Sequence, residues 1–275
     1  MSTFRTSFPR SADEAADALR RVLAANGTPL VVGGGTLAVP SLSRGELTPT
    51  DVVDLGRTGL DRIELTTHAV EIGAQVNYQQ LLDSPVVTAR LPLLHQLCAG
   101  ITGGIQIRHQ GTVAGALCAA RPFSDAPAAL VALDAQVFVR SADASRIVPA
   151  EKFLRGAEEN DLGPGEFVAG IRLPLGERRA GYVKLKFAES SWPIMTAAAM
   201  LPGLVVLGGV ARVPVRVVLP PRATAADVRA AVAASLESVP SGHRWSDLRA
   251  GWDYRRRVAP EIAVRAFIRA EGTPA

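Results

Sequence analysis

Residues 106–126 read QIRHQGTVAGALCAARPFSDA and combine many small side chains with a single acid, Asp125. Thr112, Gly115 and the alanines around them leave little side-chain volume, so a neighbouring element or a ligand can approach the backbone closely. The stretch is therefore typical of either a loop that contacts a ligand or a tightly packed core strand. A second stretch of small residues, VVGGGTL at residues 31–37, makes the ligand interpretation more attractive than either stretch would alone.

The earlier stretch contains Gly33-Gly34-Gly35-Thr36 directly after the apolar run at residues 29–32. In such an arrangement a strand ends and bare backbone N–H groups become available to an anion. The spacing differs from the G-x-G-x-x-G pattern of dinucleotide-binding turns. A plain flexible turn therefore stays open as an alternative for this motif.

The composition is that of a globular protein with a substantial core. The chain has 275 residues, of which 48% are hydrophobic and 20% are charged. Its apolar runs are too interrupted to span a bilayer, and its N-terminal residues lack the apolar core of a signal peptide, so we expect a cytoplasmic protein. The two cysteines, Cys98 and Cys118, provide neither a disulfide framework nor a zinc or iron–sulfur site, so no metal is expected in this chain.

The positive charge is concentrated near the C-terminus. The formal net charge is +4, and residues 244–269 contain seven arginines against the three acids Asp247, Asp253 and Glu261. Such a segment could suit an acidic partner or nucleic acid. Because no aromatic-interleaved or zinc-finger pattern accompanies it, a solvated helix face is the favoured interpretation, and no nucleic-acid partner is expected.

The pattern of apolar residues predicts an α+β fold. In the first part it indicates helices at residues 12–25, 78–82, 91–99 and 127–133, and strands at 29–32, 51–55, 63–65, 69–74 and 136–140. Consecutive strands at 166–174, 181–187, 193–201, 203–210 and 215–219 suggest an antiparallel sheet. A helix at 224–236 and a last helix, or helix pair broken at Pro260, complete the chain. A change of composition near residues 175–179 marks a candidate domain boundary.

Several phrases, in their order and spacing, resemble a known family. They are GGGTL at residues 33–37, IRHQGTVAGAL at 107–117, PFSD at 122–125, and Lys184 ahead of Ser191-Trp192-Pro193. The chain resembles, along its whole length, the FAD-binding (medium) subunits and domains of molybdenum hydroxylases, the group of xanthine dehydrogenase, aldehyde oxidoreductase and carbon monoxide dehydrogenase. The C-terminal phrases LGGVARVPVR and SDLRAGWDYRRRVAPEIAVRAF are also similar to this family.

The resemblance implies a fold in three parts. Residues 1–176 would form a two-subdomain FAD-binding domain of the PCMH type, divided at about residues 1–56 and 57–176. Residues 177–275 would form a C-terminal α+β domain with a three-stranded antiparallel sheet and helices.

The resemblance also implies FAD as the cofactor. Residues 33–37 and 112–116 would surround the pyrophosphate, Asp125 would hold a polar part of the flavin nucleotide, and Lys184 would lie near the isoalloxazine. The residues expected to bind FAD are Val32, Gly33, Gly34, Gly35, Thr36, Leu37, Gly103, Ile107, Gly111, Thr112, Gly115, Ala116, Asp125, Val168 and Lys184.

The chain departs from the family pattern at four positions. Leu37 follows the first loop's Thr where the family has a small polar residue, and His109 and Ala116 each replace an Asn. Ala114 replaces a Gly. Each change removes a polar contact or narrows the approach, so we expect weaker or altered FAD binding.

Three functions follow from these observations. The first is an electron-transfer subunit that relays electrons between a [2Fe–2S] and molybdopterin partner and NAD or another acceptor. The second is a stand-alone FAD-dependent dehydrogenase or oxidase that acts on a small molecule, with His109, Tyr78 or Glu189 as the candidate acid or base. The third is a flavin-free interaction module.

Overall fold

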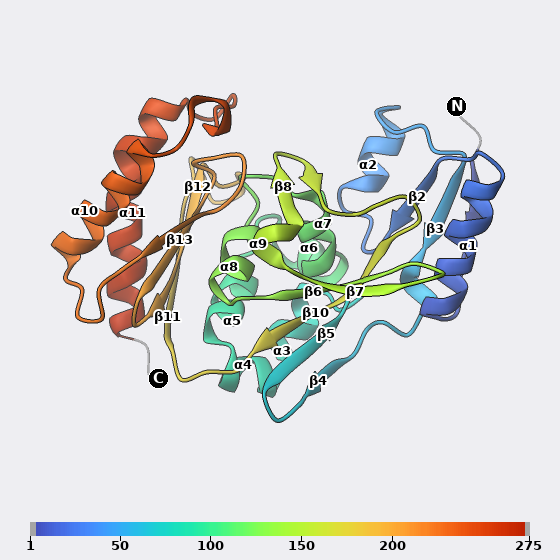
Figure 1. Cartoon of the computed structure of the whole chain (residues 1–275), viewed down its shortest axis with the longest axis horizontal. Helices are drawn as coiled ribbons and strands as arrows, with labels where there is room; N and C mark the ends of the chain where they lie inside the picture. Colours follow the sequence, from blue (N-terminus) through green and yellow to red (C-terminus); the bar gives the residue numbers. More distant parts are fainter. Residues whose placement is uncertain (1–3, 273–275) are drawn as a thin grey trace.

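The computed structural model describes residues 4–272 and places three main sheets one after another across the molecule (Figure 1). The first sheet is parallel, with the order β1-β3-β2. Its elements are β1 (Arg5–Ser7), β2 (Pro29–Val32) and β3 (Asp51–Asp54). Helix α1 (Ala12–Ala24) packs on this sheet through its buried alanines and Leu19, and Ser11 caps it by accepting a hydrogen bond from the Glu14 N–H at 3.1 Å.

The central sheet has five antiparallel strands in the order β4-β5-β10-β6-β7. They are β4 (Ile63–Leu65), β5 (Ala69–Gly73), β6 (Gln136–Arg140), β7 (Ser145–Pro149) and β10 (Phe167–Pro174). The prediction that residues 166–174 belong to the same sheet as the strands that follow them is wrong. Ile171 pairs with both Ile72 and Val137, so β10 occupies the middle of the central sheet.

Short helices follow or connect the strands of the first and central sheets. They are α2 (Ala38–Ser43), η1 (Leu55–Arg57), α3 (Tyr78–Asp83), α4 (Pro85–Arg90), α5 (Pro92–Ala99), α6 (Gly104–Gln110), α7 (Val113–Ala119), α8 (Ala126–Ala132) and α9 (Ala150–Phe153). A small hairpin, β8 (Leu154–Gly156) and β9 (Glu159–Asn160), follows α9. The helices near residues 78–82, 91–99 and 127–133 confirm the sequence predictions, whereas α2, α4, α6 and α7 were not predicted.

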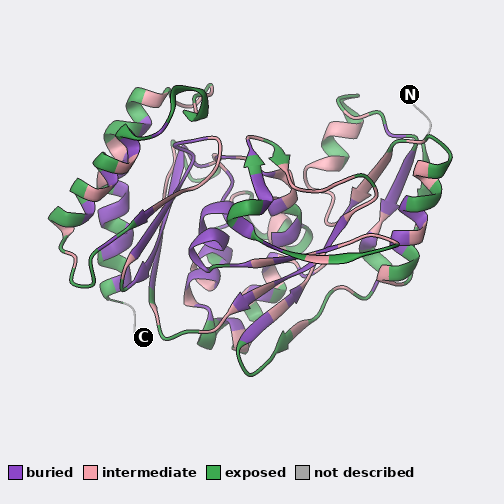
Figure 2. Cartoon of the chain, in the orientation of Figure 1, coloured by how far each residue is buried: buried purple, intermediate pink, exposed green. Residues whose placement is uncertain are grey.

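The third sheet is an antiparallel meander of four strands, where the resemblance implied three. Its strands are β11 (Arg179–Leu185), β12 (Met195–Leu201), β13 (Leu204–Gly208) and β14 (Val215–Val218). All of β12 is buried, because Ala198 and Met200 join the core of the central part while Ala197 and Ala199 join the core under the last helices (Figure 2). The α+β fold class is thus confirmed, and the domain boundary at residue 176 stays a prediction.

The outer face of this sheet is covered by α10 (Ala225–Glu237) and α11 (Trp252–Glu271), which η2 (Ser241–His243) separates. The predicted break at Pro260 is wrong, because α11 continues through it. Ala259, Ile262 and Ala263 around the proline are buried against the sheet, and this packing outweighs the missing backbone donor. Within residues 4–272, no helix combines the length and apolar character needed to cross a membrane.

The arginine-rich segment is only partly the solvated face that its charge suggested. Arg255 is fully buried. Its guanidinium donates to the carbonyls of Gly209 and Ala250, at 2.7 and 3.0 Å, and to Asp247 at 2.6 Å. The prediction is therefore wrong for Arg255, which fastens the loop before α11 to the third sheet.

Candidate functional site

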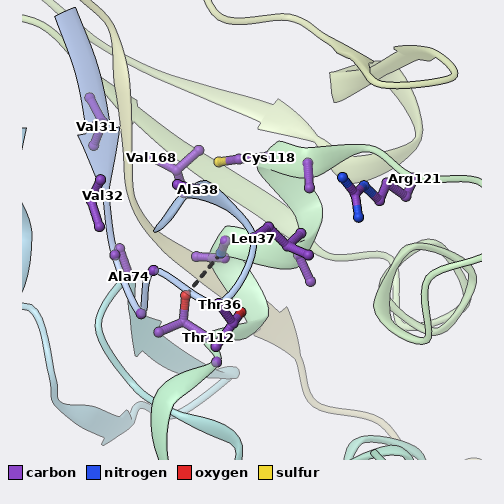
Figure 3. A pocket seen from close by; sticks show the side chains of 18 of the residues that line it. Val31, Val32, Thr36, Leu37, Ala38, Ala74, Thr112, Cys118, Arg121 and Val168 are labelled. Carbon is purple, nitrogen blue, oxygen red and sulfur yellow. Dashed lines mark hydrogen bonds between the residues drawn. The ribbon is translucent and has the colours of Figure 1, made fainter. Parts of the chain in front are cut away.

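A cavity of about 640 Å³ lies where the end of β2, the helices α2 and α7, and strand β10 meet. Both small-residue stretches line it, although they are distant in the sequence (Figure 3). Every residue expected to bind FAD lines this cavity except Gly103 and Lys184. The fold therefore brings together the two stretches that the sequence had paired.

The two stretches touch each other through their backbones. A Cβ on Gly34 would lie 1.7 Å from the carbonyl oxygen of Gln110. A Cβ on Gly33 would lie 3.2 Å from Nε2 of Gln75 and 3.5 Å from Oγ1 of Thr112. Gly34 in particular has no room for a side chain, so the first loop is shaped by its contact with the second.

The core-strand interpretation of the second stretch is wrong, and the loop interpretation holds only for residues 111–112 and 120–125, because the other residues lie in short helices. Gly111 is extended (φ −69°, ψ 142°) and separates α6 from α7. Thr112 caps α7, and its Oγ1 accepts a hydrogen bond from the Gly115 N–H at 3.0 Å (Figure 3). A Thr followed by an alanine-rich run is a helix-start signal that the sequence did contain. Since the hydroxyl accepts from Gly115, its own proton is left to donate toward a ligand.

Two residues at the start of α3 hold this junction in place. The Tyr78 N–H donates to the Gly111 carbonyl at 3.1 Å, and the Asn77 side-chain amide donates to the His109 carbonyl at 3.1 Å. Asn77 and Thr112 also form a β-bridge. The position of the Thr112 hydroxyl is thus fixed by the chain on both sides.

Asp125 lies at the wall of the cavity and is almost fully buried. Its Oδ1 accepts hydrogen bonds from Lys184 Nζ at 2.8 Å and from the Tyr182 hydroxyl at 2.9 Å. Lys184 also donates to the Gly100 carbonyl and, at 3.3 Å, to Thr102 Oγ1. Lys184 therefore does not line the cavity itself but contacts Asp125, which does, and the Asp125 carboxylate balances its charge.

The three candidate acid–base residues do not come together. Tyr78 lines the cavity, but burial raises the pKa of its hydroxyl well above the ordinary range, so it stays protonated at neutral pH. His109 and Glu189 are exposed and do not line the cavity. Glu189 instead lies 3.4 Å from Lys186 on its own hairpin.

The cavity wall also contains residues that the sequence did not single out for this purpose, among them Gln75, Cys118 and Arg121. Burial raises the pKa of the Cys118 thiol to about 12. Nε2 of Gln75 is buried and has no hydrogen-bond partner among residues 4–272. Gln75 directly follows the strand predicted at residues 69–74, a position that could have drawn attention to it, whereas Arg121 carried no signal.

These residues fit a flavin dinucleotide. The volume lies in the usual range for a small-molecule pocket. Gly33 and Gly34 leave their backbone uncovered by side chains, and the Thr112 hydroxyl and the unpaired Gln75 amide add polar hydrogens beside them. Backbone N–H groups and hydroxyls of this kind suit phosphate oxygens.

Comparisons with known proteins show which family this chain resembles. The family described as "FAD binding domain in molybdopterin dehydrogenase" matches residues 2–176. The glyceraldehyde dehydrogenase medium chain of Sulfolobus acidocaldarius is 34% identical over 145 residues, which are 52% of this chain and 51% of the relative. The chain thus matches about half the length of that relative.

Two further matches are longer. The carbon monoxide dehydrogenase medium chain of Hydrogenophaga pseudoflava is 30% identical over 201 residues, covering 72% of this chain and 69% of the relative. A solved structure of carbon monoxide dehydrogenase from Hydrogenophaga pseudoflava, which lacks the Mo-pyranopterin moiety of its cofactor, superposes with a TM-score of 0.89. That superposition has 27% identity and covers 99% of this chain and 98% of the other.

The residues matched by the family contain both glycine loops, Asp125 and most of the wall of the cavity. The chain belongs to the family of FAD binding domains in molybdopterin dehydrogenases, and its cofactor is FAD.

Proposed function

We propose that this chain is the flavin-carrying medium subunit of a molybdenum hydroxylase. In this proposal it relays electrons between a partner that holds [2Fe–2S] and molybdopterin centres and an acceptor, which is NAD or another oxidant. The proposal rests on one observation above all: both glycine loops and Asp125 line a single cavity of dinucleotide size. The likeness to carbon monoxide dehydrogenase over nearly the whole of both chains supports the assignment of partners.

Within the cavity, residues 33–37 and 112–116 would hold the pyrophosphate through backbone N–H groups and the Thr112 hydroxyl. Gly34 keeps the first loop seated on the Gln110 carbonyl, and Gly111 and Thr112 are tied to Asn77 and Tyr78. When bound, FAD supplies the chemistry, because a flavin can accept electrons in pairs and release them singly. The protein's part is to position the cofactor and shape the charge around it.

The surroundings of Asp125 refine the role expected for Lys184. Because Lys184 is paired with Asp125, it would act on the flavin as half of a neutral pair rather than as a free cation. The pair also joins the end of the second loop to β11 of the third sheet. We therefore propose that the Asp125–Lys184 pair holds the wall of the flavin cavity to the third sheet.

A stand-alone dehydrogenase is the second candidate. It would need an acid or base beside the flavin, but His109 and Glu189 lie outside the cavity and Tyr78 is held in its protonated form. This arrangement favours the relay over direct oxidation of a small molecule. The fit of the cavity to a dinucleotide likewise disfavours the flavin-free module. A cytoplasmic location stays a prediction of the sequence.

The test is to purify the chain alone and then together with its co-expressed iron–sulfur and molybdopterin partners. We expect the single chain to be yellow with extractable FAD, and the complex to add iron–sulfur absorbance and to reduce the flavin when substrate is supplied to the partner. A colourless chain that takes up no FAD would refute the flavin role. Bleaching of the flavin by a small substrate in the isolated chain would instead support the stand-alone enzyme.

A further inference from the structure

Acidic side chains outnumber cationic side chains on the cavity wall. Among the described residues that line the cavity, Arg121 is the only cationic side chain. The acidic side chains on the same wall are Glu46, Asp125, Glu158 and Glu166. A diphosphate dianion entering such a wall would meet mostly carboxylates.

Three of these carboxylates are balanced by cations that do not line the cavity. Lys184 lies 2.8 Å from Asp125, Arg146 donates to Glu166 at 2.8 Å, and Arg44 donates to Glu46 at 2.9 Å. These pairs contribute little net charge to the interior. The charges that remain are Arg121 and its partner Glu158, and the charge of Arg121 adds to the hydrogen bond from Arg44 in lowering the pKa of Glu46 on the same wall.

Arg121 and Glu158 are not equivalent members of their pair. Arg121 Nε lies 3.1 Å from Glu158 Oε1, and the exposed fractions of the two side chains are 27% and 62%. The carboxylate is thus mostly hydrated, while the guanidinium is largely enclosed. Only Nε takes part in the pair, and within residues 4–272 the two Nη atoms of Arg121 have no hydrogen-bond partner, so most of the guanidinium donors are free.

The residue before Arg121 and its partner Glu158 both have an uncommon backbone conformation. Ala120 and Glu158 both have positive φ, 46° and 61°, which is uncommon for residues other than glycine. The Glu158 N–H donates to the Ala120 carbonyl at 2.9 Å, and the Asn160 amide donates to the Cys118 carbonyl at 2.7 Å. The β8–β9 hairpin thus fixes the end of α7. Figure 3 shows the guanidinium end of Arg121 turned toward the side of the cavity where Leu37 lies.

We infer that Arg121 is the counter-charge for the diphosphate of the bound dinucleotide. A guanidinium can donate two parallel hydrogen bonds to a phosphate, and it keeps its charge at any physiological pH. This contact would compensate for polar groups lost at Leu37 and Ala116, where the sequence lacks the polar residues of the family. The inference rests on the proposed flavin site, and it adds an anion-binding residue to it.

The test compares four full-length proteins by equilibrium titration of flavin fluorescence: the natural chain, Arg121→Gln, Arg121→Lys and Arg155→Gln. Arg155 is the matched control, because it lies on β8, is 60% exposed and does not line the cavity. Loss of a charged hydrogen bond predicts that Arg121→Gln raises the Kd for FAD roughly 10- to 100-fold. Arg121→Lys should recover part of this loss, and Arg155→Gln should stay within about twofold of the natural chain.

Two further measurements connect the effect to phosphate. Riboflavin, which lacks phosphate, should bind the natural chain and Arg121→Gln equally, and the dependence of the FAD Kd on salt should be weaker in Arg121→Gln. An unchanged Kd for FAD in Arg121→Gln would overturn the inference while leaving the flavin site intact. The inference would also be overturned if Arg121→Gln and Arg121→Lys lost FAD affinity equally and the salt dependence of the Kd stayed unaltered. Such a result would indicate that Arg121 stacks on the adenine instead of binding the phosphates. If the natural chain fails to bind FAD at all, the proposed function itself fails.

Discussion

Lys184 Nζ lies 2.8 Å from Asp125 Oδ1, and both side chains are withdrawn from solvent, with 11% and 3% exposed. Asp125 ends the loop between α7 and α8 and Lys184 belongs to the third sheet, so this buried pair joins the two parts of the chain at the cavity wall. The Tyr182 hydroxyl adds a hydrogen bond to the same carboxylate oxygen at 2.9 Å. The pair therefore couples the shape of the site to the C-terminal part.

Lys184→Met should destabilise the protein by about 3 kcal/mol, because it leaves the Asp125 carboxylate buried without its cation. Urea unfolding followed by circular dichroism would measure the change. Lys186→Met is the matched control, since within residues 4–272 Lys186 pairs with Glu189 alone, and Glu189 is fully exposed. The double variant Asp125→Asn with Lys184→Met should be more stable than Lys184→Met alone. A double variant that is less stable would show that the charge pair is not the cause.

Thr112→Val should weaken FAD binding roughly tenfold or more, because it removes the hydroxyl that faces the glycine loop. It should also cost about 1 kcal/mol of stability, since that hydroxyl caps α7. Thr112→Ser keeps the hydroxyl and should bind FAD nearly as well as the natural chain. Equal FAD affinity in the Val and Ser variants, measured by fluorescence titration, would remove Thr112 from the site.

Gly34→Ala should separate the two loops, because the added Cβ would lie 1.7 Å from the Gln110 carbonyl oxygen. We expect a loss of about 2 kcal/mol in stability and a drop in FAD affinity of roughly tenfold or more. Gly242→Ala provides the comparison, because no atom of the part of the chain that the structure describes lies within 4 Å of the Cβ it would add. If both variants retain FAD equally, the contact between the loops does not shape the site.

Asp247→Asn should destabilise the protein by about 3 kcal/mol at neutral pH, because Arg255 would keep a buried charge without its carboxylate. Burial raises the pKa of Asp247, but hydrogen bonds from the Arg249 backbone N–H and the charge of Arg255 outweigh this, so its pKa lies below the ordinary 3.8.

A carboxylate with a lowered pKa stabilises the folded state fully above its ordinary pKa, and this stability is lost as the pH falls through the folded value. The difference between the natural chain and Asp247→Asn should therefore be constant from about pH 5 to pH 8 and shrink below about pH 4. Urea unfolding at a series of pH values would measure it. A difference that does not shrink in acid would indicate that the hydrogen bonds of Asp247, rather than its charge, hold the loop.

The amino-acid sequence determined the two small-residue stretches, the α+β class and a set of expected FAD contacts of which all but Gly103 and Lys184 line the cavity. Small residues, strand alternation and helix caps act over short distances along the chain. The sequence did not predict that β10 lies in the central sheet or that α11 continues through Pro260, since both depend on packing against distant segments. It also favoured a solvated face for the arginines of residues 244–269, although Arg255 is buried. Only the tertiary structure decided that Asp125 balances Lys184, that Asp247 holds a buried Arg255, and that Arg121 is the cation left on the cavity wall. Charge pairing acts through space and leaves no periodic pattern in the sequence.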